Sequence, residues 1–145
     1  MSLSLFDRNE RKKNEKLAQR WGGYHELVNS WVPISHYFLE NYHRLKPHEG
    51  ASGLNSTEAM LLIHLINFKW DSKSPHPSVT TLAERLGISP RQTRNIIKRL
   101  EDLGFLKRRL RRKGATNAFD MDGLFQKLVE LQKQDIQANE EEGVS

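Results

Sequence analysis

The residues from Pro90 to Leu103 constrain the fold of this chain more than any other stretch of its sequence. Placed on a helix at about 100° per residue, they separate into an apolar face and a polar face, the pattern of a helix that packs against a core on one side only. The helix should therefore bury its apolar face and leave its polar face in solvent. The apolar face holds Thr93, Ile96, Ile97, Leu100 and Leu103, and the polar face holds Arg91, Arg94, Asn95 and Lys98.

A second helix is predicted directly before this one. Residues 79–86 carry apolar side chains at helical spacing, and Ser78 can cap their first turn. Gly87 follows at the position where a left-handed backbone commonly ends a helix. Ser89 can then cap the next helix, with Pro90 in the first turn that proline favours. The sequence thus predicts a helix, a tight turn and a second helix.

A basic hairpin is predicted over residues 105–121, directly after the helix at 90–103. It carries six cations from Lys107 to Lys113. From Arg85 to Lys113 there are eleven basic and two acidic residues, a net charge of +9. The whole chain carries +5, so the remainder sums to −4. Positive charge concentrated in this way is typical of a protein that binds a polyanion, above all nucleic acid.

The other segments are predicted to extend this unit. Residues 1–20 form a basic arm, flexible or frayed, and residues 21–53 form an aromatic helical extension and loop whose helix starts near Pro33 and packs on the domain. Asn55 and Glu58 mark the start of a buried central helix. Residues 123–138 form a C-terminal helix with a stripe of leucines, and residues 139–145 an acidic disordered tail. The leucine stripe consists of Leu124, Leu128 and Leu131.

The composition excludes several classes of protein. No cysteine occurs among the 145 residues, so the chain has no disulfide framework, thiolate metal site or thiol nucleophile. The most apolar run, residues 59–66, is far shorter than the ~20 residues of a spanning helix, and no signal peptide is evident. We therefore expect a cytoplasmic protein without a membrane partner. Motifs of enzyme sites are also missing, so we expect no catalytic residue, no metal and no cofactor.

The motifs together resemble one family. LAERLG at 82–87, the Ile88-Ser89 pair, the basic helix to Leu103 and GFL at 104–106 before a basic hairpin are similar to the winged helix-turn-helix family. The resemblance is closest to the compact type found in plasmid and phage replication initiators and in small bacterial transcription regulators. It covers residues 54–128, about half of the chain, with residues 54–122 as the winged domain itself. Thr93 departs from the family, which usually places an aliphatic residue there.

The resemblance implies a mainly α fold with a small β-hairpin wing. It also implies that helix 90–103 enters the major groove of double-stranded DNA while the wing, residues 105–121, lies on the backbone. The residue types on the polar face suit base reading, for which we name Arg91, Arg94 and Asn95. For the DNA backbone we name Ser78, Ser89, Gln92, Lys98, Arg99, Arg108, Arg109, Arg111, Arg112 and Lys113.

The leading functional hypothesis is sequence-specific binding of double-stranded DNA by a small transcription regulator. A replication initiator of plasmid or phage type, or a fragment of one, fits the same residues. A hypothesis of another class is a winged-helix module that binds a protein partner, and RNA binding is a weaker fourth. A homodimer is a further possibility, formed through the N-terminal aromatic segment or the C-terminal helix.

Overall fold

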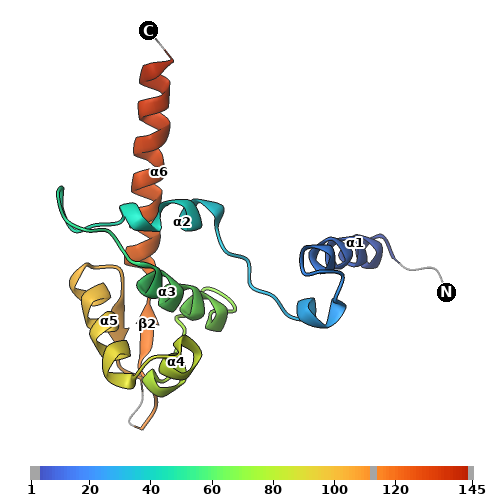
Figure 1. The fold of residues 1–145 in the computed structure, drawn as a ribbon, viewed down its shortest axis with the longest axis horizontal. Coiled ribbons are helices and arrows are strands. Elements are labelled where there is room, and N and C mark those ends of the chain that lie inside the picture. Colours follow the sequence, from blue (N-terminus) through green and yellow to red (C-terminus); the bar gives the residue numbers. More distant parts are fainter. Residues whose placement is uncertain (1–3, 112–113, 144–145) are drawn as a thin grey trace. The chain divides into compact units, whose positions relative to one another are not determined.

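The computed structural model describes residues 4–111 and 114–143. The chain divides into two compact units, Met1–Pro33 and Ile34–Ser145, and each is described here by itself (Figure 1). Arg112 and Lys113, two of the wing residues predicted to contact DNA, lie outside the described residues.

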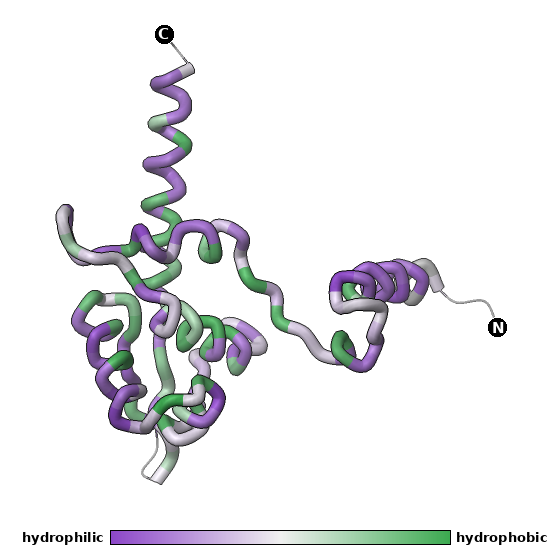
Figure 2. The backbone as a smooth tube through the Cα atoms, viewed as in Figure 1, coloured by the Kyte–Doolittle hydropathy of each residue, from purple (hydrophilic) through white to green (hydrophobic). Residues whose placement is uncertain are grey.

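The first unit consists of helix α1, Leu5–Arg20, and the short 3-10 helix η1, His25–Val28. The predicted flexible or frayed arm is thus a helix over most of its length, and hydrophilic residues dominate it (Figure 2). Gly22 and Gly23 both have positive φ and turn the chain after α1. Ala18 and Val28 are buried in this unit.

The aromatic extension predicted over residues 21–53 is divided between the two units, because the boundary falls after Pro33. In the second unit, helix α2, His36–Asn41, leads into the 3-10 helix η2, Tyr42–Arg44. The prediction that the helix starts near Pro33 was wrong. It starts at His36, because the side chain of Ser35 accepts the backbone N–H of Phe38 and caps the helix there. The predicted packing on the domain is confirmed by Phe38 and Leu45, both buried in the core.

Three helices form the centre of the second unit: α3, Ser56–Phe68; α4, Val79–Leu86; and α5, Pro90–Asp102. Each begins at the predicted cap, where the side chain of Asn55, Ser78 or Ser89 accepts a backbone N–H three residues later. Gly87 ends α4 with φ of 69°, a left-handed conformation that glycine adopts without strain. The predicted helix, turn and helix are confirmed.

The hairpin consists of strands β1, Lys107–Arg109, and β2, Ala118–Asp120, which are antiparallel with Arg108 opposite Phe119. Its strands are short, but its place in the chain is the predicted one. The backbone N–H of Phe119 donates to the carbonyl of Pro75 at 2.8 Å, so the loop before α4 lies along the other edge of β2. Phe119 is buried, which anchors the hairpin to the helical core.

Helix α6, Asp122–Glu142, closes the unit and α2 contacts it. Its first turn packs closely against the turn after α5. A Cβ on Gly123 would lie 2.0 Å from the carbonyl oxygen of Gly104, so only glycine fits there. The predicted end at residue 138 and disordered tail from 139 were wrong, since the glutamates at 140–142 favour helix and continue it. In the predicted leucine stripe, Leu124 is buried, and Leu128 and Leu131 are partly buried and pack against the core of the same chain.

Candidate nucleic-acid interface

The outer face of α5 presents four polar side chains to solvent. Within the described part of the chain, no hydrogen bond or ion pair engages any of these four side chains. Their donors, and the amide oxygen of the asparagine, are therefore available to an external ligand. The four are Arg91, Arg94, Asn95 and Lys98, as the helical spacing predicted.

The opposite face of α5 holds the helix in place. Ile97 and Leu100 are buried in the core, and Thr93 is fully buried beside them. The hydroxyl of Thr93 donates to the carbonyl of Ser89 at 3.0 Å. A buried hydroxyl is costly only when it lacks a partner, so threonine is accommodated at a position where the family usually has an aliphatic residue.

Arg99 has a structural role that the sequence did not reveal. Its guanidinium donates to both carboxylate oxygens of Glu58, at 2.6 and 2.8 Å, and Glu58 is only 2% exposed. The same carboxylate accepts the backbone N–H of Asn55 in the capping box of α3. Arg99 thus joins α5 to the first turn of α3, and its contact with the DNA backbone stays a prediction.

Two wing arginines are paired within the protein as well. Arg108 donates to Glu101 and Arg109 to Asp120, both at 2.7 Å. The backbone N–H of Asp122 and the guanidinium of Arg109 hold the pKa of Asp120 below its ordinary value. The two ion pairs join the wing to α5 and brace β1 against β2, and the contacts of Arg108 and Arg109 with the DNA backbone stay predictions.

Two other wing cations remain available. Lys107 is exposed, and its side chain has no hydrogen bond or ion pair in the described part of the chain. Arg111 is also exposed and makes only long contacts, at 3.4 and 3.5 Å, with Thr116. The described wing therefore carries fewer free charges than its sequence indicates.

The polar residues predicted at the helix starts act as caps. Ser78 accepts the N–H of Thr81, and Ser89 accepts that of Gln92, each at 3.1 Å. In turn, the side-chain oxygen of Gln92 accepts a hydrogen bond from the backbone N–H of Ser89. These contacts orient α4 and α5, and the contacts of Ser78, Ser89 and Gln92 with the DNA backbone stay predictions.

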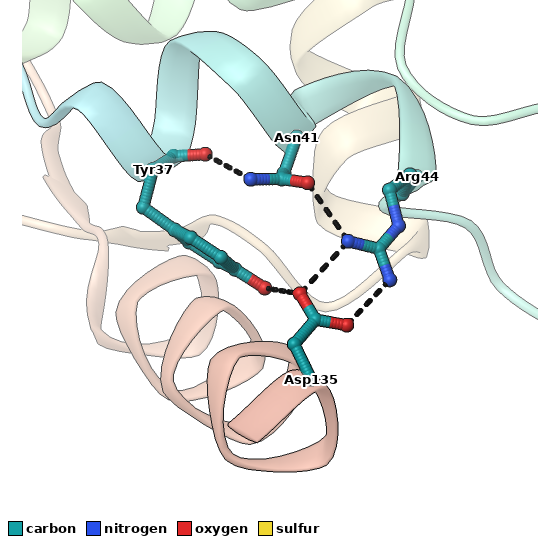
Figure 3. A network of polar contacts seen from close by, with 4 residues as sticks. All are labelled: Tyr37, Asn41, Arg44 and Asp135. Atoms are coloured by element: carbon teal, nitrogen blue, oxygen red, sulfur yellow. Dashed lines mark hydrogen bonds and ion pairs between the residues drawn. The ribbon is translucent and has the colours of Figure 1, made fainter. Parts of the chain in front are cut away.

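A polar network away from this interface fixes helix α6 (Figure 3). Arg44 forms a two-pronged ion pair with Asp135, and Tyr37 donates to the same carboxylate at 2.7 Å. Asn41 accepts from Arg44 and completes the network. The bonds from Arg44 and then from Tyr37 lower the pKa of Asp135 to about 2. The network therefore joins α2 and η2 to the middle of α6.

The described residues form neither a metal site nor a membrane-spanning helix. Across residues 4–111 and 114–143, no three histidine, aspartate or glutamate side chains gather as a metal site requires. His64 lies at the edge of the core, where desolvation and the nearby charge of Arg85 lower its pKa. Among the described helices, none is both long and apolar enough to span a bilayer.

Comparison with known proteins finds similarity to one domain family and to several solved structures. Residues 52–106 match the model of a helix-turn-helix domain family. The N-terminal domain of the DnaD protein from Geobacillus kaustophilus is 24% identical, with a TM-score of 0.58 over 86% of this chain and 96% of that one. No curated protein sequence matches the chain significantly.

Two regulators are more distant structural neighbours. A MarR-like transcriptional regulator from Thermotoga maritima is 13% identical, with a TM-score of 0.42 over 97% of this chain and 83% of that one. ZitR from Lactococcus lactis, solved in complex with DNA, is 14% identical, with a TM-score of 0.41 over 98% and 84%. These two similarities are too weak to add to the fold assignment. Residues 52–106 are thus similar to a helix-turn-helix domain, and the hairpin that follows α5 gives this region a winged-helix fold.

Proposed function

We propose that this protein binds double-stranded DNA with sequence specificity and acts as a small, non-enzymatic transcription regulator. The observation that carries the proposal is the outer face of α5, where exposed arginine, asparagine and lysine side chains have no partner in the described protein. In helix-turn-helix proteins the second helix lies in the major groove and its first residues contact base edges. The hairpin would then lie on the adjacent backbone.

The proposed roles follow from side-chain chemistry. Arg91 and Arg94 can each donate two hydrogen bonds to guanine, and Asn95 can pair with adenine. Lys98, Lys107 and Arg111 form no ion pair in the described part of the chain, so we assign them to phosphates. Glu101 and Asp102 lie at the end of α5, and their charge confines base reading to the first two turns of the helix.

Selection from a random duplex library, followed by a salt titration on the recovered site, tests this function. We expect one enriched sequence and an affinity that falls as salt concentration rises, because phosphate contacts release counterions. Affinity without an enriched sequence would leave only nonspecific binding. No affinity for duplex DNA would favour a winged-helix module that binds a protein partner.

A role in replication initiation is the second candidate. The structural neighbour with a TM-score of 0.58 is the N-terminal domain of the DnaD protein, so a similar fold occurs as one part of a larger protein. An initiator carries such a domain beside others. Recovery of a replication origin, rather than a promoter, in genome-wide binding of the intact protein would favour this role.

We further propose that the first unit is the surface through which two copies associate. Its aromatic residues Trp21, Tyr24 and Trp31 and the neighbouring Leu27 are 52–64% exposed, and a unit this small needs additional apolar burial to be stable. A dimer would present two α5 helices to a two-fold DNA site.

Light scattering on the full chain tests this association. The Trp21→Ser/Trp31→Ser variant should be monomeric. The Val129→Ser/Ile136→Ser variant removes the exposed apolar residues of α6 and should remain dimeric. A monomeric full chain, or a dimer that survives loss of both tryptophans, would contradict the proposal.

A further inference from the structure

A second surface lies beside the wing and shares only Arg111 with the interface described above. It is a hollow of about 510 Å³ between the loop that joins α3 to α4 and the hairpin. A volume of this size is within the range of small-molecule sites and can hold a nucleobase. Its lining includes Phe68, Trp70, Asp71, Lys73, His76 and Arg111.

Trp70, which lines this hollow, is unusually exposed for a tryptophan. Its side chain is 86% exposed, more than that of any other described aromatic residue. Tryptophan normally buries most of its large apolar surface. The ring of the neighbouring Phe68 already has a partner, the guanidinium of Arg85 at 4.6 Å from its centre. Trp70 is therefore the open aromatic surface of the hollow.

The loop that carries Trp70 is held in shape by its own hydrogen bonds. The amine of Lys69 donates to the carbonyls of Asp71 and Lys73, and the carboxylate of Asp71 accepts the N–H of Lys73 at 2.8 Å. The hydroxyl of Thr116, in the hairpin, donates to the carbonyl of His76 at 2.6 Å. The indole is thus presented from a braced loop, so ordering this loop adds little entropic cost to binding.

The charge around Trp70 favours an anionic strand. Lys73 and Arg111 line the hollow with two positive charges, against the single negative charge of Asp71. The guanidinium of Arg111 extends toward Thr116 and so lies on the side of the hairpin that borders the hollow. An aromatic ring flanked by cations is the arrangement with which proteins bind single-stranded nucleic acid, because each base stacks while its phosphate is neutralised.

We propose that this hollow binds an unpaired nucleobase of DNA held by the wing, with the base stacked on Trp70 and its phosphates near Lys73 and Arg111. The base must be unpaired, since bases inside a duplex are already stacked on their neighbours and offer no free face. The inference rests on the proposed DNA-binding function, because the wing supplies the strand. The protein would thereby prefer a junction between duplex and single strand to an uninterrupted duplex.

Fluorescence of Trp70 tests this directly. In a Trp21→Phe/Trp31→Phe chain, Trp70 is the only tryptophan. The probes are the selected duplex with blunt ends and the same duplex with a short unpaired oligothymidine arm beside the wing. We expect the armed duplex to quench Trp70 and to bind at least about fivefold more tightly than the blunt one, in line with the contribution of one stacked base.

Two variants of Trp70 sharpen the test. Trp70→Ala should bind both probes equally, and Trp70→Phe should retain most of the preference because phenylalanine also stacks. The exposure of Trp70 makes either variant compatible with folding, which the melting temperature checks. Equal binding of the two probes by the parent chain, or a preference that persists in Trp70→Ala, would overturn the inference and leave the proposed function intact. Failure to bind the blunt duplex would overturn the proposed function itself, and the nucleobase site with it.

Discussion

The Glu58 carboxylate and the Arg99 guanidinium, 41 residues apart in the chain, meet at 2.6 Å and join the first turn of α3 to the last turn of α5. Glu58 is buried, whereas the Arg99 side chain is 40% exposed. A buried charge that loses its partner is strongly destabilising. The position of α5, the candidate recognition helix, thus depends on one carboxylate in the first turn of α3.

Glu58→Gln should lower the free energy of unfolding by about 1 to 3 kcal/mol, because Arg99 loses its charged partner, whereas the glutamine oxygen can still accept the N–H of Asn55 in the capping box of α3. Urea denaturation followed by circular dichroism measures the change. The matched control is Glu101→Gln, which removes the more exposed ion pair to Arg108 and should cost less than about 1 kcal/mol. Equal losses in both variants would mean that burial of Glu58 adds nothing to the pair.

Arg94→Ala should weaken binding to the preferred DNA site by about 1 to 3 kcal/mol and binding to random DNA much less, because base contacts carry sequence information. Fluorescence anisotropy on both duplexes at one salt concentration measures the two losses. Lys98→Ala provides the comparison, since a phosphate contact should cost a similar amount on both. An equal loss of affinity on the preferred and the random duplex would mean that Arg94 contacts the DNA backbone and not a base.

Arg111→Gln should reduce the slope of log affinity against log salt by about 1, as expected for one phosphate contact. Arg109→Gln is the matched control, because Arg109 is already paired with Asp120 and should change the slope less. A salt titration on one duplex compares the variants. If Arg109 changed the slope as much as Arg111, its internal ion pair would have to open on DNA.

Asp135→Asn should lower stability most at neutral pH and progressively less in acid. The pKa of Asp135 is held at about 2 in the folded protein, below the ~3.9 of an unfolded aspartate. A depressed carboxylate stabilises the fold above its unfolded pKa, and this contribution is lost as the pH falls from about 4 to about 2. Melting temperatures of both proteins across this range should therefore converge, and a constant difference would exclude ionisation of Asp135 as the cause.

The outer face of the candidate site was predictable because it depends on local geometry. Helical spacing alone places Arg91, Arg94 and Asn95 opposite Ile97 and Leu100, whatever the helix packs against. The partners of Arg99, Arg108 and Arg109 were not predictable in this way. Each is a cation in a basic run, and nothing within one helical turn distinguishes a free charge from a paired one.

By itself, the sequence determined the elements whose causes lie within a few residues: the caps at Asn55, Ser78 and Ser89, the left-handed turn at Gly87 and the amphipathic face of α5. Only the tertiary structure decided the ion pairs of Glu58 with Arg99 and of Arg44 with Asp135, which join residues 41 and 91 positions apart. Caps and helical faces arise from hydrogen bonds and side-chain directions repeated along a local backbone. An ion pair between distant residues forms only where the packing of the apolar core brings its two charges together.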